Sequence, residues 1–171
     1  MAAGKTYEPI ATTTVSSATN SVSFSSISGA YTDLVIVASV QSSATDTLLL
    51  RCGNGSVDTG SNYSITVLKG NGSSATSART SSAGNFYVDY AAYAPSSAST
   101  FSSLIIQFNN YSNTTTYKTM LSRANNAAVG VDAIVGLWRS TSAINTLEFK
   151  YSPGTNIASG STFTLYGIAA A

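Results

Sequence analysis

Any chemistry in this 171-residue chain has to come from carboxylates, hydroxyls and one thiol, because the sequence has no histidine and a single cysteine, Cys52. A Ser-His-Asp or Cys-His centre therefore lacks its base, and an ordinary zinc site lacks its nitrogen and sulfur ligands. One cysteine also excludes a disulfide within the chain. We expect Cys52 to be a buried apolar side chain.

Paired carboxylates are the remaining route to acid–base catalysis. No acidic residue lies within three positions of another, so no local pair or metal-ligand cluster is visible among Glu8, Asp33, Asp46, Asp58, Asp89, Asp132 and Glu148. Asp58 lies in a segment that resembles a fragment of a calcium loop, but calcium sites recruit several carboxylates and Asp and Gly are typical of turns. The sequence therefore predicts a turn at Asp58, and no catalytic residue, metal or cofactor.

The charge content excludes further classes of protein. Charged residues make up 9% of the chain, with a net charge of +1, against about 25% in an average soluble domain. This balance gives no electrostatic footprint for nucleic acid. No segment reaches the roughly 18 apolar residues of a membrane-spanning helix. The first residues lack the apolar region of a signal peptide, so we expect synthesis in the cytoplasm.

The elements that would position these residues are β-strands, because apolar residues alternate along most of the chain and helical spacing is missing. A run of four apolar residues at 34–37 predicts a central strand covered on both faces. Residues 69–72 predict a tight turn, and residues 73–84 are interpreted as a polar, flexible stretch. The predicted strands cover residues 7–15, 21–27, 32–41, 45–52, 63–68, 85–92, 100–108, 115–123, 131–139, 144–151 and 161–168.

This pattern predicts an all-β fold, namely an antiparallel β-sandwich of jelly-roll type with about 10–11 strands and no substantial helix. No repeat of fixed period and no shift in composition divides the chain. We therefore expect one sandwich domain over residues 7–171, with residues 1–6 as an N-terminal arm.

The strand surfaces are filled with small hydroxyl side chains, from 30 serines and 22 threonines. Neutral hydroxyls cost less to desolvate than charges when they find hydrogen-bond partners. Cores of protein interfaces are likewise poor in charge and rich in tyrosine. The composition favours a surface that is largely covered in an assembly, and the alternative is a composition that is merely usual for the lineage.

Aromatic residues give the candidate contacts. The segment 86–90, with Tyr93 nearby, is interpreted as core packing, a subunit contact or a platform for stacking sugars. Trp138 is predicted to pack in the core or between subunits. The N-terminal segment 5–10 is a candidate arm that reaches a neighbour. The candidate subunit or shell contacts are Tyr7, Pro9, Ile10, Tyr87, Tyr90 and Tyr93.

Several segments resemble a group of small β-rich virion proteins of tailed phages, commonly phages of cyanobacteria or other aquatic hosts. In chain order they are VSFSSI (22–27), YTDLVIV (31–37), DTGSNYS (58–64), NYS (110–112), GLWRS (136–140) and GSTFTLYGI (160–168). The resembling pattern has Asn-Gly-Asp-Thr-Gly where this chain has NGSVDTG at 54–60. Two residues are thus inserted, and we expect the tip of that loop to differ.

The resemblance implies a virion structural protein and not an enzyme. It fits a capsid decoration or cement protein that binds the outer head surface, forms a homotrimer and contacts the major capsid protein or another virion protein. The alternative is a binding module of a tail or head fibre that recognises a host surface glycan. A glycosidase would require two acids about 5–10 Å apart in a cleft.

Overall fold

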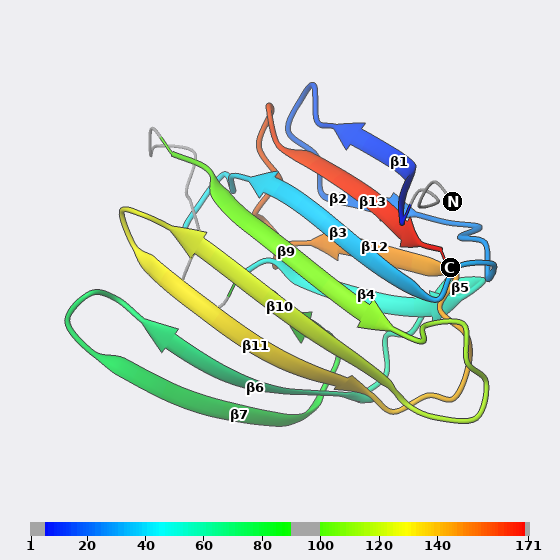
Figure 1. Cartoon of the computed structure of the whole chain (residues 1–171). Coiled ribbons are helices and arrows are strands. Elements are labelled where there is room, and N and C mark those ends of the chain that lie inside the picture. Colours follow the sequence, from blue (N-terminus) through cyan, green and yellow to red (C-terminus); the bar gives the residue numbers. More distant parts are fainter. Residues whose placement is uncertain (1–5, 90–99, 170–171) are drawn as a thin grey trace.

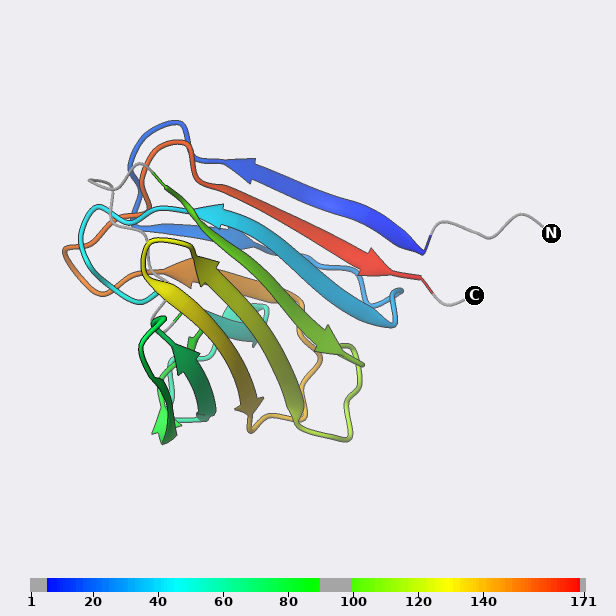
Figure 2. The same cartoon turned by 60° about the vertical axis from the view of Figure 1, so that its left-hand side comes forward.

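A computed structural model describes residues 6–89 and 100–169, in which the strands form two antiparallel sheets packed face to face (Figures 1 and 2). The predicted all-β sandwich is therefore confirmed, whereas its jelly-roll type stays a prediction. Over the same ranges, no helix has the length and apolar character that a membrane crossing requires.

The large sheet has eight strands in the order β1-β13-β3-β9-β10-β11-β6-β7. Strands β9, β10 and β11 are consecutive in the chain and form a meander at its centre, and β1 and β7 lie at its two edges (Figure 1). The strand bounds are β1 Tyr7–Thr14, β13 Thr162–Ile168, β3 Asp33–Val40, β9 Ser102–Asn109, β10 Lys118–Asn126, β11 Gly130–Trp138, β6 Tyr63–Gly70 and β7 Ala75–Ala83.

The small sheet has five strands and covers only part of the large one. Its order is β2-β12-β4-β5, and β8 also pairs with β4. The strand bounds are β2 Ser21–Phe24, β12 Thr146–Lys150, β4 Leu49–Asn54, β5 Ser56–Val57 and β8 Phe86–Tyr87. Strand β5 consists of the two residues inserted relative to the resembling pattern, and it folds back on β4 through Gly55, whose φ is 81°.

The interpretation of residues 73–84 as a flexible stretch is wrong. Residues 75–83 form β7, which pairs antiparallel with β6 from Gly70↔Ala75 to Tyr63↔Ala83. Alanine, serine and threonine carry no apolar period that predicts a strand. The pairing follows from the turn at residues 71–74, where Asn71 Oδ1 accepts hydrogen bonds from the backbone N–H groups of Ser73 and Ser74. Strand β6 then provides the backbone partners with which β7 pairs.

The core lies between the sheets and consists of the inward-facing residues of both. Cys52 is buried and free, as predicted, and Trp138 is 2% exposed. Phe86 packs edge-on against Tyr63, with the ring centroids 4.9 Å apart, and its ring centroid lies 6.1 Å from that of Phe108. Most of the predicted strand ranges therefore contain strands, and their buried residues form this core.

Strand β10 has polar residues on its buried face and an apolar residue on its exposed face. Lys118 and Ser122 point inward and are buried, while Leu121 points outward and is 41% exposed. The Lys118 Nζ donates to the carbonyl oxygens of Thr116 at 2.7 Å and Thr141 at 3.1 Å, so the buried ammonium group has hydrogen-bond partners. The buried Lys118 is therefore hydrogen-bonded inside the sandwich, while the apolar Leu121 faces solvent.

Candidate interaction surface

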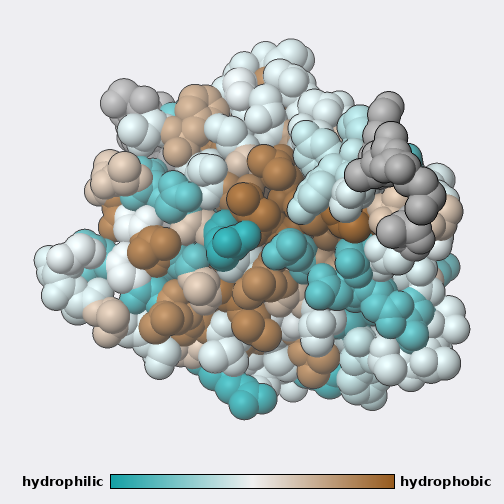
Figure 3. Space-filling model, viewed as in Figure 1, coloured by the Kyte–Doolittle hydropathy of each residue, from teal (hydrophilic) through white to brown (hydrophobic). Residues whose placement is uncertain are grey.

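The outer face of the large sheet, on the side away from the small sheet, carries a group of exposed aliphatic side chains. Figure 3 shows hydrophobic residues gathered over the middle of this face, with hydrophilic residues among them. We name this group the outer apolar surface. Its members and exposed fractions are Val37 42%, Leu68 58%, Ile105 38%, Leu121 41%, Val131 56% and Val135 55%.

Strand register makes these residues neighbours, although they are far apart in sequence. Val37 on β3 lies opposite Ile105 on β9, and Leu121 on β10 lies opposite Val135 on β11. Side chains directly opposite each other on one face are about 4.5–5.5 Å apart at Cβ. Leu121 and Val135 also line a hollow of about 280 Å³ on this face, together with Gln107.

The apolar run at residues 34–37 explains how such a surface arises. Leu34 and Ile36 face the core with 0% exposure, and Val35 on the other face is 4% exposed. Val37, on that same outer face, stays open to solvent. The prediction of a strand covered on both faces therefore holds for one end of the run and fails at Val37, because only part of the outer face is covered within the described residues.

The charges near the outer apolar surface are mainly positive. Arg79 and Arg123 are exposed, and their positions in the ladders place them on the outer face, next to Thr66 and Ala133 respectively. Asp33, at the end of β3, accepts a hydrogen bond from the Asn110 backbone N–H at 2.7 Å. The described part of this face therefore combines apolar side chains with the exposed Arg79 and Arg123, and the carboxylate of Asp33 is engaged locally.

Asp58, the acidic residue in the turn, is held by a network of hydrogen bonds. Its Oδ2 accepts hydrogen bonds from Trp138 Nε1 and Asn62 Nδ2, both at 2.8 Å, and its Oδ1 accepts one from the Gly60 N–H at 2.8 Å. Partial burial alone raises the pKa of Asp58, but these hydrogen bonds outweigh it and lower the pKa. The predicted turn is confirmed, and it is joined to the end of β11.

The same network links two of the segments that carry the sequence resemblance. Tyr63 Oη donates to the Asp58 carbonyl oxygen at 2.9 Å and accepts from the Cys52 N–H at 3.1 Å. Arg139 donates to the Ser61 carbonyl oxygen at 2.7 Å. The segments at 58–64 and 136–140 are therefore in contact, and their polar residues hold one corner of the sandwich together.

Asp89 is the most deeply buried carboxylate in the described structure. It is 0% exposed, its Oδ1 accepts a hydrogen bond from the Leu48 N–H, and its Oδ2 has no hydrogen-bond partner. Burial raises its pKa well above the ordinary value, and the negative charges of Asp132 and Asp46 add to this. Tertiary structure thus brings three acids near one another that are distant in sequence.

This acidic group does not form a usable catalytic or metal site in the described ranges. Asp89 and Asp132 are both buried, so a substrate has no access to the pair, and no group of three or more His, Cys, Asp or Glu side chains there has the arrangement of a metal site. Glycoside hydrolysis needs its two carboxyl groups at either side of a bound sugar. In the described ranges, Asp89 and Asp132 are both buried and offer no such arrangement at the surface.

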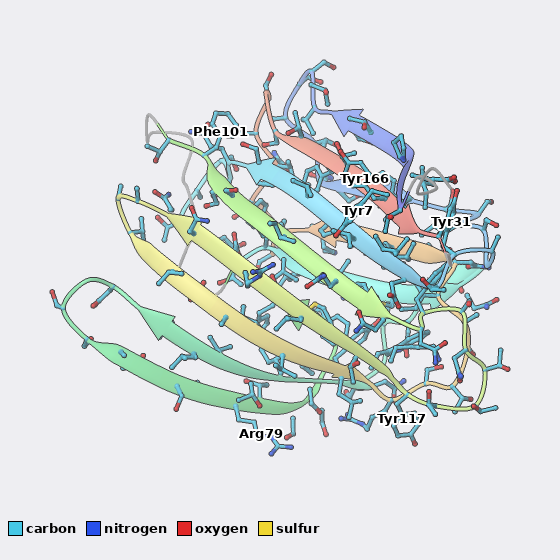
Figure 4. The ribbon with its side chains drawn as sticks, in the orientation of Figure 1. Tyr7, Tyr31, Arg79, Phe101, Tyr117 and Tyr166 are labelled. Atoms are coloured by element: carbon cyan, nitrogen blue, oxygen red, sulfur yellow. The ribbon has the colours of Figure 1, made fainter. Side chains whose placement is uncertain are left out.

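The candidate contact residues divide into three groups. Tyr7 is 55% exposed on the outer face and packs edge-on against Tyr166, with the ring centroids 6.1 Å apart (Figure 4). Pro9 is exposed beside it. Ile10 and Tyr87 are partly buried against the core, and Tyr90 and Tyr93 lie outside the described residues.

Two exposed aromatic residues were not among the candidates. Tyr117 is 53% exposed and Phe101 is 39% exposed, and Figure 4 places them at well-separated points, both away from Tyr7. Phe86, at the start of the predicted aromatic platform, is buried. The described aromatic residues therefore form no single stacking platform, and the exposed aliphatic group is the larger feature.

No known protein family matches the sequence, and no curated protein is similar to it. The fold and the surface define the class of protein: an all-β sandwich whose larger sheet exposes an apolar face. What this face can do chemically is dock another surface, because it offers area to bury and few charges to desolvate.

Proposed function

We propose that this protein is a structural component of a phage virion, a capsid decoration protein that binds the outer head surface and stabilises it. The observation that carries the proposal is the outer apolar surface. Soluble monomers rarely expose large contiguous apolar patches, and such patches mark interaction sites. The phage setting comes from the sequence resemblance.

The size of the face fits a stable contact. Strands β3, β9, β10, β11 and β6 have eight or nine residues each. With about 4.8 Å between strands and about 3.4 Å per residue, their outer face covers roughly 650 Å². A standard interface buries about 800 Å² per partner. Most of the outer face would therefore be covered.

The chemistry of the face also defines the partner. Aliphatic side chains such as Val135 and Leu121 require an apolar counterpart, and Arg79 and Arg123 favour a partner with exposed carboxylates. A shell surface that combines both would bind the outer face in one orientation. Binding to the assembled shell more tightly than to free shell subunits stabilises the shell by mass action.

The proposal is tested first by counting copies of this protein in purified particles. A capsid decoration protein is expected at hundreds of copies per particle. A number in the tens or fewer would overturn the capsid assignment and place the protein at the tail or a fibre.

A second test uses the protein added to heads that lack it, with binding measured by co-sedimentation. Val135→Lys and Leu121→Lys each put an unpaired charge into the covered surface, and we expect at least a tenfold loss of affinity, on the order of 1.4 kcal/mol or more. Ser23→Lys, on the exposed side of β2 opposite Glu148, is the control and should bind normally. Equal binding by all three variants would exclude the outer face as the contact.

A further inference from the structure

Strand β7 has an unusual position in the sandwich. It pairs only with β6 among the described strands, and its residues 75–79 are exposed on both faces. Seven of its nine residues are exposed, among them Thr76 and Ala78 on its inner side. Alternate residues of an edge strand direct their N–H and C=O groups away from the sheet, where a further strand can pair with them.

The other edge of the sheet is protected, and β7 is not. Strand β1 contains Glu8 and Pro9, and its pairing with β13 shifts register between Pro9 and Ala11. Proline, charge and irregular pairing are common devices against strand addition. Over residues 75–80, β7 has no proline and a single charge, Arg79, and its register with β6 shifts only beyond Thr80.

We propose that β7 pairs antiparallel with β7 of a second copy of this chain, which joins the two large sheets across a two-fold axis. A two-fold contact closes on itself. Because β1 is blocked, neither copy can add a third chain through its opposite sheet edge. The small side chains of Ala75, Ser77 and Ala78 allow the two backbones to approach along their whole length.

The position of Arg79 selects the register of this pairing. With Ser77 of both copies opposite each other on the axis, Arg79 lies opposite Ala75 of the second copy. The two Arg79 residues are then about 14 Å apart along the strands, which exceeds the Debye length of about 10 Å. A register centred on Ala78 would bring them to about 7 Å and is disfavoured. Figure 4 shows Arg79 at this edge of the sheet.

The contact is small, since six residues of a strand bury much less than the roughly 800 Å² per partner of a standard interface. We therefore expect a weak dimer that forms at high concentration. If the protein covers a shell as proposed above, neighbouring copies would meet this condition. The pairing itself does not depend on that function, because it is measured with the isolated protein.

The test is sedimentation equilibrium between about 10 µM and 1 mM, where the average mass should rise from 17.5 kDa toward twice that value. Ser77→Lys and Ser77→Glu each place like charges opposite each other on the axis, and each should weaken dimerisation several-fold. An equimolar mixture of the two variants should restore it. Ala75→Glu should strengthen the dimer, because the new carboxylate faces Arg79 of the second copy.

Thr12→Lys, an exposed substitution on the protected β1 edge, is the matched control and should leave dimerisation unchanged. A protein that stays monomeric at 1 mM, or a dimer or trimer unaffected by both Ser77 variants, overturns the proposal. These outcomes are independent of the shell-binding assay, in which the Val135→Lys and Leu121→Lys variants report on the other surface.

Discussion

Asp58 and Asp89 are both carboxylates that accept backbone hydrogen bonds, yet their pKa values shift in opposite directions. Asp58 lies near the surface and receives hydrogen bonds on both oxygens, which lower its pKa. Asp89 is fully buried with one oxygen unpaired, and desolvation raises its pKa. Hydrogen bonds to the charged form lower the pKa of a carboxyl, and burial raises it. The number of hydrogen-bond donors around each carboxyl therefore decides the direction of its pKa shift.

Asp58→Asn should destabilise the protein at neutral pH by about 1–3 kcal/mol, because an amide nitrogen cannot accept from Trp138 or Asn62 and leaves a donor unpaired. A carboxyl whose folded pKa is lowered stabilises the fold above its ordinary pKa of 3.8, and this contribution is lost as the pH falls through the folded pKa. The variant should therefore lose part of the acid dependence. Urea unfolding at pH 7 and pH 3, followed by Trp138 fluorescence, measures both effects.

Trp138→Phe serves as the companion variant, since it removes one of the donors to Asp58 Oδ2 and leaves the carboxyl in place. It should destabilise the fold and shift its acid transition to higher pH, with unfolding followed by circular dichroism. An Asp58→Asn protein with wild-type stability and an unchanged acid profile would contradict the role assigned to this network.

Asp89→Asn should stabilise the protein at neutral pH, by about 1 kcal/mol or more, because burial of the Asp89 carboxyl requires either an unpaired charge or the uptake of a proton, and an amide requires neither. A carboxyl whose folded pKa is raised binds a proton in the native state that the unfolded state has already lost. The free energy of unfolding therefore falls as the pH rises from the unfolded pKa through the folded pKa. The variant should lack this decline when urea unfolding is compared at pH 4 and pH 8.

Asp89→Ala separates the charge from the hydrogen bond at this position. It removes the acceptor of the Leu48 N–H and should be less stable than Asp89→Asn at every pH. If both variants are equally destabilised at pH 8, the burial of the Asp89 charge is not the source of the cost.

At the scale of elements, the strands of the large sheet are held by close contacts as well as by their ladders. Gly167 on β13 lies under the ring of Tyr31, and a Cβ at this position would come within 2.3 Å of the ring. Tyr31 Oη in turn donates to Glu8 on β1 at 3.2 Å. The missing side chain at Gly167 therefore lets one loop residue connect two strands.

Gly167→Ala should destabilise the fold by about 1–3 kcal/mol, the usual cost of forcing extra volume into a packed site. Thermal unfolding of Gly167→Ala measures the loss, and Tyr31→Ala combined with Gly167→Ala should recover part of it by removing the clash. Gly29→Ala is the control, because a Cβ at Gly29 would lie at an ordinary 3.6 Å from Ser112 Cβ, its nearest neighbour. Equal effects of the two glycine substitutions would show that the clash with Tyr31 is not the cause.

At the scale of the whole molecule, the sandwich is asymmetric, since eight strands face five. Among the described residues, the outer apolar surface and the β7 edge are exposed, and they differ in chemistry. The outer face offers apolar area, whereas β7 offers backbone hydrogen-bonding groups. We assign the first to a shell surface and the second to another copy of the chain. The homotrimer implied by the resemblance stays a prediction and would use a surface other than the β7 edge.

Much of the fold was predictable from the pattern of side chains. The alternation of Val22 and Phe24 with serines predicts β2 and its buried face, and the structure shows both residues at 5% exposure. Strand β7 was not predictable in this way. Its alanines, serines and threonines bury nothing, and only the ladder with β6 makes it a strand.

The sequence by itself determined the all-β class, the buried faces of most strands, and the lack of histidine and disulfide chemistry. These properties depend on residue types and on a two-residue period, both of which are local. The tertiary structure decided that Val37, Ile105, Leu121 and Val135 lie on one outer surface. It also decided that Trp138 donates a hydrogen bond to Asp58, and that β7 is an edge strand among the described strands. Register and sheet order bring distant residues together, and a local period does not contain that information.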